Sequence, residues 1–353
     1  MEVIHFLFST PLVLIIILIA LVFDFYNGMN DAANSIATVV STQVLKPWQA
    51  VIWAAFFNFV AFAGGYVPVL NHFLGLHVAT TIGKGIVHTS IVDPYVILAT
   101  LVGAVIWSAI CTHSGLPISI SHALVGGFSG AAVVKAGTGA LVMSGITKTL
   151  IFIVLSPLLG MFFGWILMVA VFWICRDMQP RKIDKHFRHL QLVSAASYSL
   201  SHGANDAQKT MGIIAILLFT TAGSPYAGLE LTEKTFPIWV VIACFFVIAM
   251  GTLAGGWHVI KTLGQKVTKL RPVHGFCAET GGALSIFIAT ALGAPVSTTH
   301  TITGSIIGVG TTHRLSAVRW GVARRIVMAW VLTIPASAIM SALTWYVIKL
   351  LFL

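Results

Sequence analysis

The chain has 353 residues, of which 58% are hydrophobic and only 8% are charged, and its mean hydropathy is +0.95. These values exclude an ordinary soluble domain, and the long continuous apolar runs exclude the short alternating segments of a membrane β-barrel. The formal net charge of +10 does not indicate nucleic-acid binding, because the basic residues gather in short loops between apolar runs. The composition predicts an all-α polytopic membrane protein.

Apolar runs of spanning length follow one another along the chain. They lie near residues 4–26, 48–70, 91–111, 149–175, 236–257 and 326–353. Four further segments, 27–45, 113–135, 190–222 and 272–312, are apolar but interrupted by Gly, Pro and hydroxyl residues. Together they predict about 10–12 transmembrane segments, some of them broken or re-entrant.

Most Lys and Arg residues fall in three loops, which the positive-inside rule assigns to the cytoplasm. The first, 176–189, separates a first half (1–175) from a second half (190–353). The other two contain Lys261, Lys266, Lys269 and Arg271, and Arg314, Arg319, Arg324 and Arg325. The chain is therefore expected to cross a bacterial-type inner (plasma) membrane many times, with both termini outside.

Two sequence motifs occur twice. "GMNDAANSIA" from Gly28 matches "GANDAQKTMG" from Gly203, and "GLPISISHALVGG" from Gly115 matches "GAPVSTTHTITGS" from Gly293. The order and nearly constant spacing predict a duplicated chain. Because each half makes an odd number of crossings, the second half inserts upside down, and such inverted repeats form a substrate site near the midplane. Segment 190–222 is roughly 50 Å of helix, too long for one span, so helix breaks are predicted at "YNGMND" and "SHGAND".

The Pro-hydroxyl motifs predict helix N-termini, with Pro117 and Pro295 in the first turn. The nearby hydroxyls are candidate phosphate contacts, since a helix N-terminus attracts anions. They are Ser119, Ser121, Ser297, Thr298 and Thr299. The alternative is that they only cap re-entrant helices. His122 and His300, which close these motifs, are interpreted as packed hydrogen-bonding residues.

The Asn-Asp motifs offer carboxylate and amide oxygens, which suit a hard cation such as sodium at Asp31 and Asp206. The candidate coupling-ion residues are Asn30, Asp31, Asn205, Asp206 and Glu279, the last as a proton or extra cation site. The alternatives are Asp residues bonded to backbone N–H groups and a Glu279 paired with a cytoplasmic base. Proton coupling through histidine is also possible, and the role of Asp24 stays open.

The two copies differ where Asn34 corresponds to Lys209 and Ala33 to Gln208. The Lys209 ammonium is expected to replace one coupling ion or to contact the anion directly. Asn34, Gln208 and Lys209 are therefore added to the candidate phosphate contacts.

The four motifs, in this order, resemble the inorganic phosphate transporter (PiT) family across both halves. The resemblance implies a secondary transporter that moves phosphate with sodium or protons by alternating access, in an inverted-repeat fold and often as a homodimer. By matching position it assigns the Asn-Asp residues to ion and phosphate coordination and the Pro-hydroxyl residues to phosphate. The more symmetric members of the family have an Asn-containing second motif that resembles the first. The different sequence "AQKT" here leaves proton coupling open, and a sulfate symporter of the same fold is the alternative. No cofactor is expected, and an intramembrane phosphotransferase is disfavoured because no Arg lies in the motifs.

Overall fold

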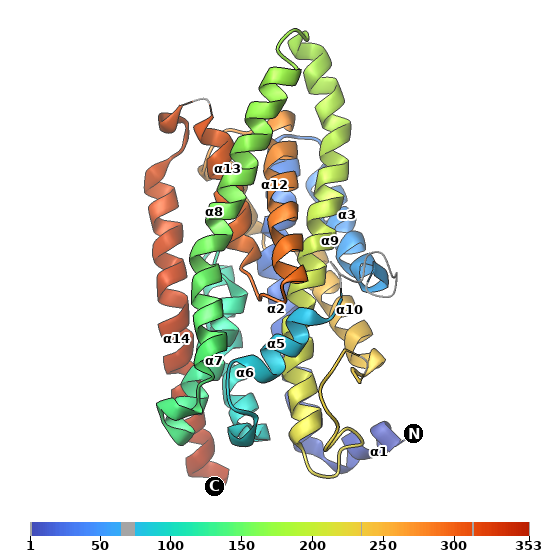
Figure 1. Ribbon diagram of the computed structural model, residues 1–353, viewed down its shortest axis with the longest axis vertical. Coiled ribbons are helices and arrows are strands. Elements are labelled where there is room, and N and C mark those ends of the chain that lie inside the picture. Colours follow the sequence, from blue (N-terminus) through green and yellow to red (C-terminus); the bar gives the residue numbers. More distant parts are fainter. Residues whose placement is uncertain (1, 65–74, 234, 313, 353) are drawn as a thin grey trace.

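The computed structural model describes residues 2–64, 75–233, 235–312 and 314–352, and these are almost entirely helical (Figure 1). The first half contains α1 (Glu2–Ser9), α2 (Pro11–Ser41), α3 (Pro47–Gly64), α5 (His77–Gly85), α6 (Pro94–His113), α7 (Ile120–Ala136) and α8 (Met143–Ile174). The second half contains α9 (Pro180–Thr220), α10 (Ile238–Ala254), α11 (Trp257–Lys266), α12 (Pro272–Ala291), α13 (Thr298–Thr311) and α14 (Trp320–Phe352).

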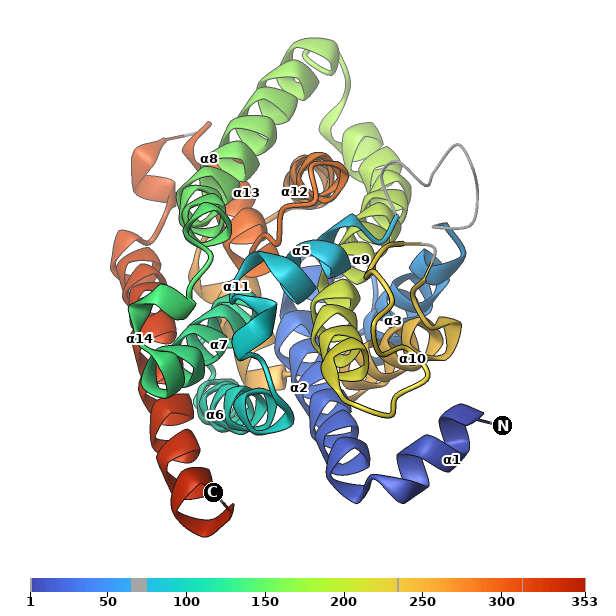
Figure 2. The same ribbon diagram turned by 60° about the horizontal axis from the view of Figure 1, so that its bottom comes forward.

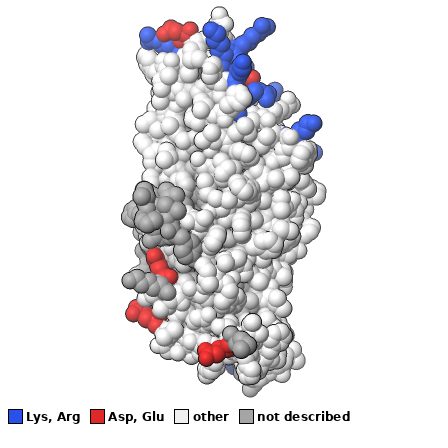
Figure 3. All heavy atoms as spheres, turned by 90° about the vertical axis from the view of Figure 1, so that its right-hand side faces the viewer, with Lys and Arg blue, Asp and Glu red and all other residues white. Residues whose placement is uncertain are grey.

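The membrane character of the fold is confirmed. Five of the described helices, α2, α3, α6, α8 and α14, are long and apolar enough to span a bilayer, and α10 with the start of α11, bent by 73°, would add a sixth. Figure 3 shows Lys and Arg gathered at the end where α8 joins α9, above a wide band without charge. The predicted total of segments stays a prediction, because α7 has only 17 residues and α9 and α12 carry ionisable side chains.

The predicted helix breaks at the Asn-Asp motifs are wrong, since α2 and α9 run through them without interruption. The two motif glycines serve close helix packing instead. A Cβ on Gly28 would lie 2.1 Å from the carbonyl oxygen of Ile248 in α10, and one on Gly203 would lie 2.6 Å from that of Asn58 in α3. Glycine lets backbones approach this closely because it has no side chain.

The predicted basic loop 176–189 is also largely helical, because α9 begins at Pro180. With 41 residues, α9 is about 60 Å long. It therefore extends well beyond a single membrane span at the end where it meets α8 (Figure 1). Residues 190–220 of the segment that looked too long for one crossing belong to this one continuous helix.

The core pair α2 and α9 is antiparallel. Thr42, just past the end of α2, donates to Gln191 early in α9 at 2.9 Å, whereas Thr210 late in α9 donates to Asp24 in α2 at 2.8 Å. Two hairpins, α6–α7 and α12–α13, enter from opposite ends and meet at their tips (Figures 1 and 2). The inverted, re-entrant architecture agrees with the sequence prediction.

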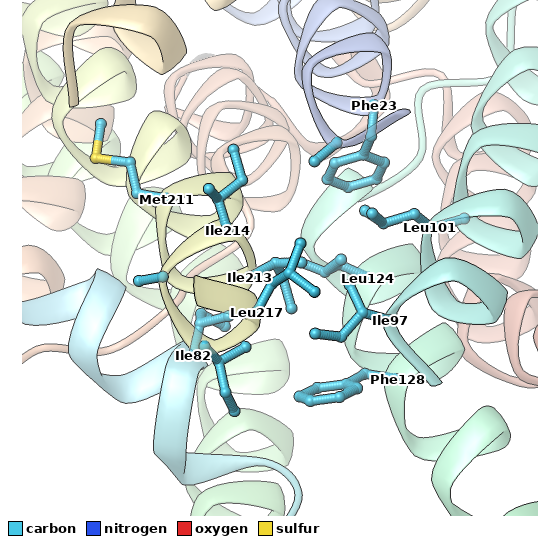
Figure 4. Packing of buried hydrophobic residues seen from close by; sticks show 14 of the residues in the cluster. Phe23, Ile82, Ile97, Leu101, Leu124, Phe128, Met211, Ile213, Ile214 and Leu217 are labelled. Carbon is cyan, nitrogen blue, oxygen red and sulfur yellow. The ribbon is translucent and has the colours of Figure 1, made fainter. Parts of the chain in front are cut away.

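Each half covers the hairpin of the other. The last helix of the first half, α8, packs on α12 and α13, and the last helix of the second half, α14, packs on α6 and α7. A buried apolar layer lies between the hairpin tips and the end of the molecule that carries the chain termini. It is enclosed by α2, α5, α6, α7 and α9. In Figure 4, Ile213 and Leu217 of α9 point toward Leu124 and Ile97 on the facing side of this layer. The tips therefore lie between this layer and the basic end.

Candidate functional site

The carboxylates of Asp31 and Asp206 meet at one hydroxyl. Thr298 Oγ1 lies 3.1 Å from Asp31 Oδ2 and 3.3 Å from Asp206 Oδ2. The two aspartates are only 2% and 1% exposed. The antiparallel α2 and α9 thus place both Asn-Asp motifs at the tip of the α12–α13 hairpin, in a site closed to solvent on all sides.

His202 lies between the same two carboxylates. Its Nε2 is 3.6 Å from Asp31 Oδ2 and 3.4 Å from Asp206 Oδ2, and its Nδ1 is 3.1 Å from Asn58 Oδ1 in α3. The three residues offer ligand atoms within 4.8 Å of one another, so they form a buried group able to hold a metal ion. The sequence analysis did not assign His202 to the site.

The hairpin tips present two helix N-termini to the site. α7 begins at Ile120 and α13 at Thr298, so Ser119 and Ser297 are N-caps, which accept hydrogen bonds from the backbone N–H of His122 and His300, each at 3.2 Å. The predicted helix starts are thus present, but two to three residues later than expected. Pro117 and Pro295 lie in the irregular segments before them, not in the first turn.

The tips also bond to each other. Thr299 Oγ1 donates to Ile118 O at 2.9 Å, and Ser121 Oγ donates to Val296 O at 3.1 Å. The positive ends of two helix dipoles therefore lie side by side beside the carboxylates. Such an arrangement attracts an anion, provided that a cation compensates the aspartates.

Asn30 and Asn205 make matching contacts in the two halves. Asn30 Nδ2 donates to Thr112 Oγ1 at 2.8 Å, and Asn205 Nδ2 donates to Thr290 Oγ1 at 2.9 Å. The Oδ1 atoms of both residues, and that of Asn34, are buried without a hydrogen-bond partner among the described residues. Buried amide oxygens left without donors are suitable ligands for a hard cation.

Lys209 is fully engaged within the site. Its ammonium nitrogen lies 2.6 Å from Asp206 Oδ1, 2.5 Å from Ser121 Oγ and 2.8 Å from Val296 O. Asn34, at the matching place in the first half, donates to Thr299 Oγ1 at 3.0 Å. Of the predicted phosphate contacts, Asn34, Lys209, Ser121, Thr298 and Thr299 therefore come together around the aspartates.

Gln208 does not join them, and its predicted contact with phosphate is not supported. Its Oε1 accepts from the backbone N–H groups of Val78 and Ala79 at the start of α5, at 2.9 and 3.1 Å. Its Nε2 donates to the carbonyl oxygens of Gly75 and Ala204. All four hydrogen-bonding positions of the amide are thus occupied in fixing α5 to α9.

Glu279 forms a separate polar cluster nearer the basic end. It accepts from Thr38 at 2.6 Å, from Gln191 at 2.9 Å and from Ser194 at 2.5 Å, and is fully buried. The alternative of a cytoplasmic Lys or Arg partner is thus excluded for the described side chains. Asp24, also buried, lies on the other side of the site against Thr210.

The closing histidines of the hairpin motifs are packed as expected, but the expected hydrogen bonding is weak: His122 Nδ1 and His300 Nε2 have no partner among the described residues, and His300 Nδ1 lies 3.5 Å from Ile153 O. The rings of His122 and His300 are 4.6 Å apart, and His300 stacks on Trp330 at 3.6 Å. A further contact that the sequence did not indicate comes from Tyr198, whose hydroxyl donates to Thr298 O at 3.0 Å. Tyr198 thereby fixes the first residue of α13 against α9.

The chain is similar to known proteins over its whole length. A model of the phosphate transporter family matches residues 27–341. The chain is 54% identical over 336 residues to a Rhizobium meliloti protein named "Probable low-affinity inorganic phosphate transporter", an alignment that covers 95% of this chain and 96% of the relative. A Bacillus subtilis protein of the same name is 43% identical, with 97% and 98% covered. A solved structure named "The sodium-dependent phosphate transporter" matches with a TM-score of 0.83 and 26% identity, covering 97% of this chain and 100% of that chain. The chain belongs to the phosphate transporter family.

Proposed function

We propose that this protein is a sodium-coupled symporter of inorganic phosphate that works by alternating access around the Asp31–Asp206 site. The observation that carries the proposal is the single Thr298 hydroxyl, which lies within 3.3 Å of both carboxylates at the junction of two helix N-termini. Carboxylates and helix N-termini prefer opposite charges, so a site containing both suits a cation and an anion together.

Three features support sodium as the coupling ion. Asn30 and Asn34, in the same motif as Asp31, each have a buried amide oxygen without a hydrogen-bond partner among the described residues. Carboxylate, amide and hydroxyl oxygens are the ligands of hard cations. The related solved structure is named as sodium-dependent. Phosphate would then take hydrogen bonds from the hydroxyls of Ser119, Ser297 and their neighbours at the hairpin tips.

Orientation follows from charge. Both termini lie at the end opposite the α8–α9 junction (Figure 1), where Lys and Arg gather. The positive-inside rule supports a cytoplasmic basic end and external termini in a bacterial inner membrane. Since the site is closed to solvent, transport requires the two hairpins to open in turn toward each side. The homodimer implied by the family resemblance stays part of this proposal.

The test is uptake of labelled phosphate into proteoliposomes. We expect an inward sodium gradient to drive accumulation when the proton gradient is collapsed by an ionophore. Asp31→Asn should abolish the sodium dependence, whereas Asp184→Asn, which changes an exposed aspartate beside Arg188, should not. Accumulation driven by a proton gradient alone would show that the coupling ion is the proton and not sodium. Sulfate that competes at equal concentration would favour the sulfate symporter.

A further inference from the structure

The two halves contain the same oxygen triad beside each aspartate. In the second half the triad consists of Asp206 Oδ1, Ser121 Oγ and Val296 O. The duplicated motifs relate these atoms to Asp31 Oδ1, Thr299 Oγ1 and Ile118 O. Thr299 Oγ1 lies 3.2 Å from Asp31 Oδ1 and 2.9 Å from Ile118 O, so the first triad is assembled as closely as the second. The repeat therefore provides two equivalent clusters of a carboxylate, a hydroxyl and a carbonyl oxygen.

A protein cation occupies only one of these triads. The Lys209 ammonium donates to all three oxygens of the second triad, at 2.5 to 2.8 Å, and so uses all three of its N–H groups. In the first half the matching residue is Asn34, which is uncharged and leaves its own Oδ1 without a partner. An ammonium and an alkali cation compete for the same oxygen ligands, because both are compact positive charges. Lys209 thus provides the positive charge for the second triad, whereas the first triad must bind a cation from solution.

We propose that Lys209 is a built-in cation that replaces one exchangeable coupling ion at Asp206, so that only the Asp31 triad loads and releases an ion. This inference rests on the proposed function, because it assigns the number of ions used by that site. A covalently attached ammonium cannot cross the membrane. The protein therefore moves one cation fewer per phosphate than it would with an uncharged residue at position 209.

The direct test restores symmetry with Lys209→Asn. In proteoliposomes, the reversal potential of phosphate flux under imposed sodium gradients gives the number of sodium ions per phosphate. We expect this number to rise by one in Lys209→Asn, with a steeper dependence of uptake on sodium. An unchanged number would overturn the inference. The matched control is Lys135→Asn, which breaks a Lys–Asp pair with the same 2.6 Å separation, to Asp93, away from the site, and should leave the number unchanged.

A binding measurement covers variants that do not transport. Equilibrium binding of ²²Na⁺ to purified protein should give one more ion per chain in Lys209→Asn than in the wild type. The reciprocal variant Asn34→Lys should bind one fewer, and it carries the test if Lys209→Asn does not fold. Equal sodium counts in either variant and the wild type would overturn the inference. If the wild type takes up no phosphate, the proposed function fails, whereas the sodium counts still report on Lys209.

Discussion

Thr298 is the hydroxyl that both halves share, so Thr298→Val is the sharpest perturbation of the candidate site. The substitution removes one oxygen and replaces it with a methyl group of similar size, while the backbone of α13 can stay in place. The lost hydroxyl lies 3.1 Å from Asp31 Oδ2 and 3.3 Å from Asp206 Oδ2. Because it has a single proton, it donates to one carboxylate at a time and remains a ligand for a cation through its lone pairs.

The size of the effect follows from this geometry. A hydrogen bond to a charged group is worth about 1.5–3 kcal/mol. At about 1.4 kcal/mol for each factor of ten, the half-saturating sodium concentration for phosphate uptake should rise about 10- to 100-fold in Thr298→Val. The maximal rate at saturating sodium should fall less, since the methyl group leaves the hairpin tips in contact through Thr299 and Ser121.

The measurement is phosphate uptake into proteoliposomes across a series of external sodium concentrations. The control is Thr301→Val, one turn further along α13, whose hydroxyl donates only to Ser297 O in the preceding turn. If the two variants shift the sodium dependence by the same factor, the shift reflects general damage to α13. The assignment of Thr298 to the ion site would then be refuted.

Three further substitutions test the surrounding structure, each by thermal unfolding in detergent together with uptake. Glu279→Gln should destabilise the protein by about 1–3 kcal/mol, because its new NH₂ group meets donors where an acceptor stood; unchanged stability would mean that the three hydroxyl and amide donors are not bonded to it. Gly28→Ala should destabilise by about 1–3 kcal/mol through overpacking against Ile248 O, only 2.1 Å from the added carbon, whereas Gly139→Ala, with nothing within 4 Å, should not. Gln208→Leu should lower stability without changing the half-saturating phosphate concentration. A large rise in that concentration would instead show that Gln208 contacts phosphate.

The membrane fold was predictable from the composition and the long apolar runs, and the repeat was predictable because duplication leaves matching motifs in the sequence. The continuity of α2 and α9 through the Asn-Asp motifs was not predictable, since a glycine beside polar residues fits two structures equally well. Gly28 and Gly203 permit a break in the helix, but they also permit contact with a neighbouring backbone, and only the position of α10 and α3 decides between them. That information is tertiary and lies outside the motif itself.

Gln208 was added to the candidate phosphate contacts because it replaces Ala33 of the first motif, without regard to helical spacing. In a continuous helix, residues three and four positions apart share a face. His202, Asp206 and Lys209 therefore point to one side of α9, and Gln208 points elsewhere, toward the start of α5. Once α9 is continuous, helical spacing alone brings His202 into the site and removes Gln208 from it.

The two routes away from the site differ in a way that the repeat makes visible. Toward the basic end, Glu279 and Thr38 are joined by a hydrogen bond. The repeat relates these positions to Leu101 and Ile213, which belong to the buried apolar layer on the side of the termini (Figure 4). In the proposed transport cycle, an ion moving toward the basic end would meet these hydrogen-bonding groups, whereas the side of the termini combines one buried polar pair, Asp24 and Thr210, with apolar side chains that must separate. That separation costs about 25 cal/mol for each Å² of apolar surface exposed to water. At these two positions the repeat therefore differs between its two sides, because Glu279 and Thr38 form a hydrogen bond toward the basic end, whereas Leu101 and Ile213 pack in the apolar layer.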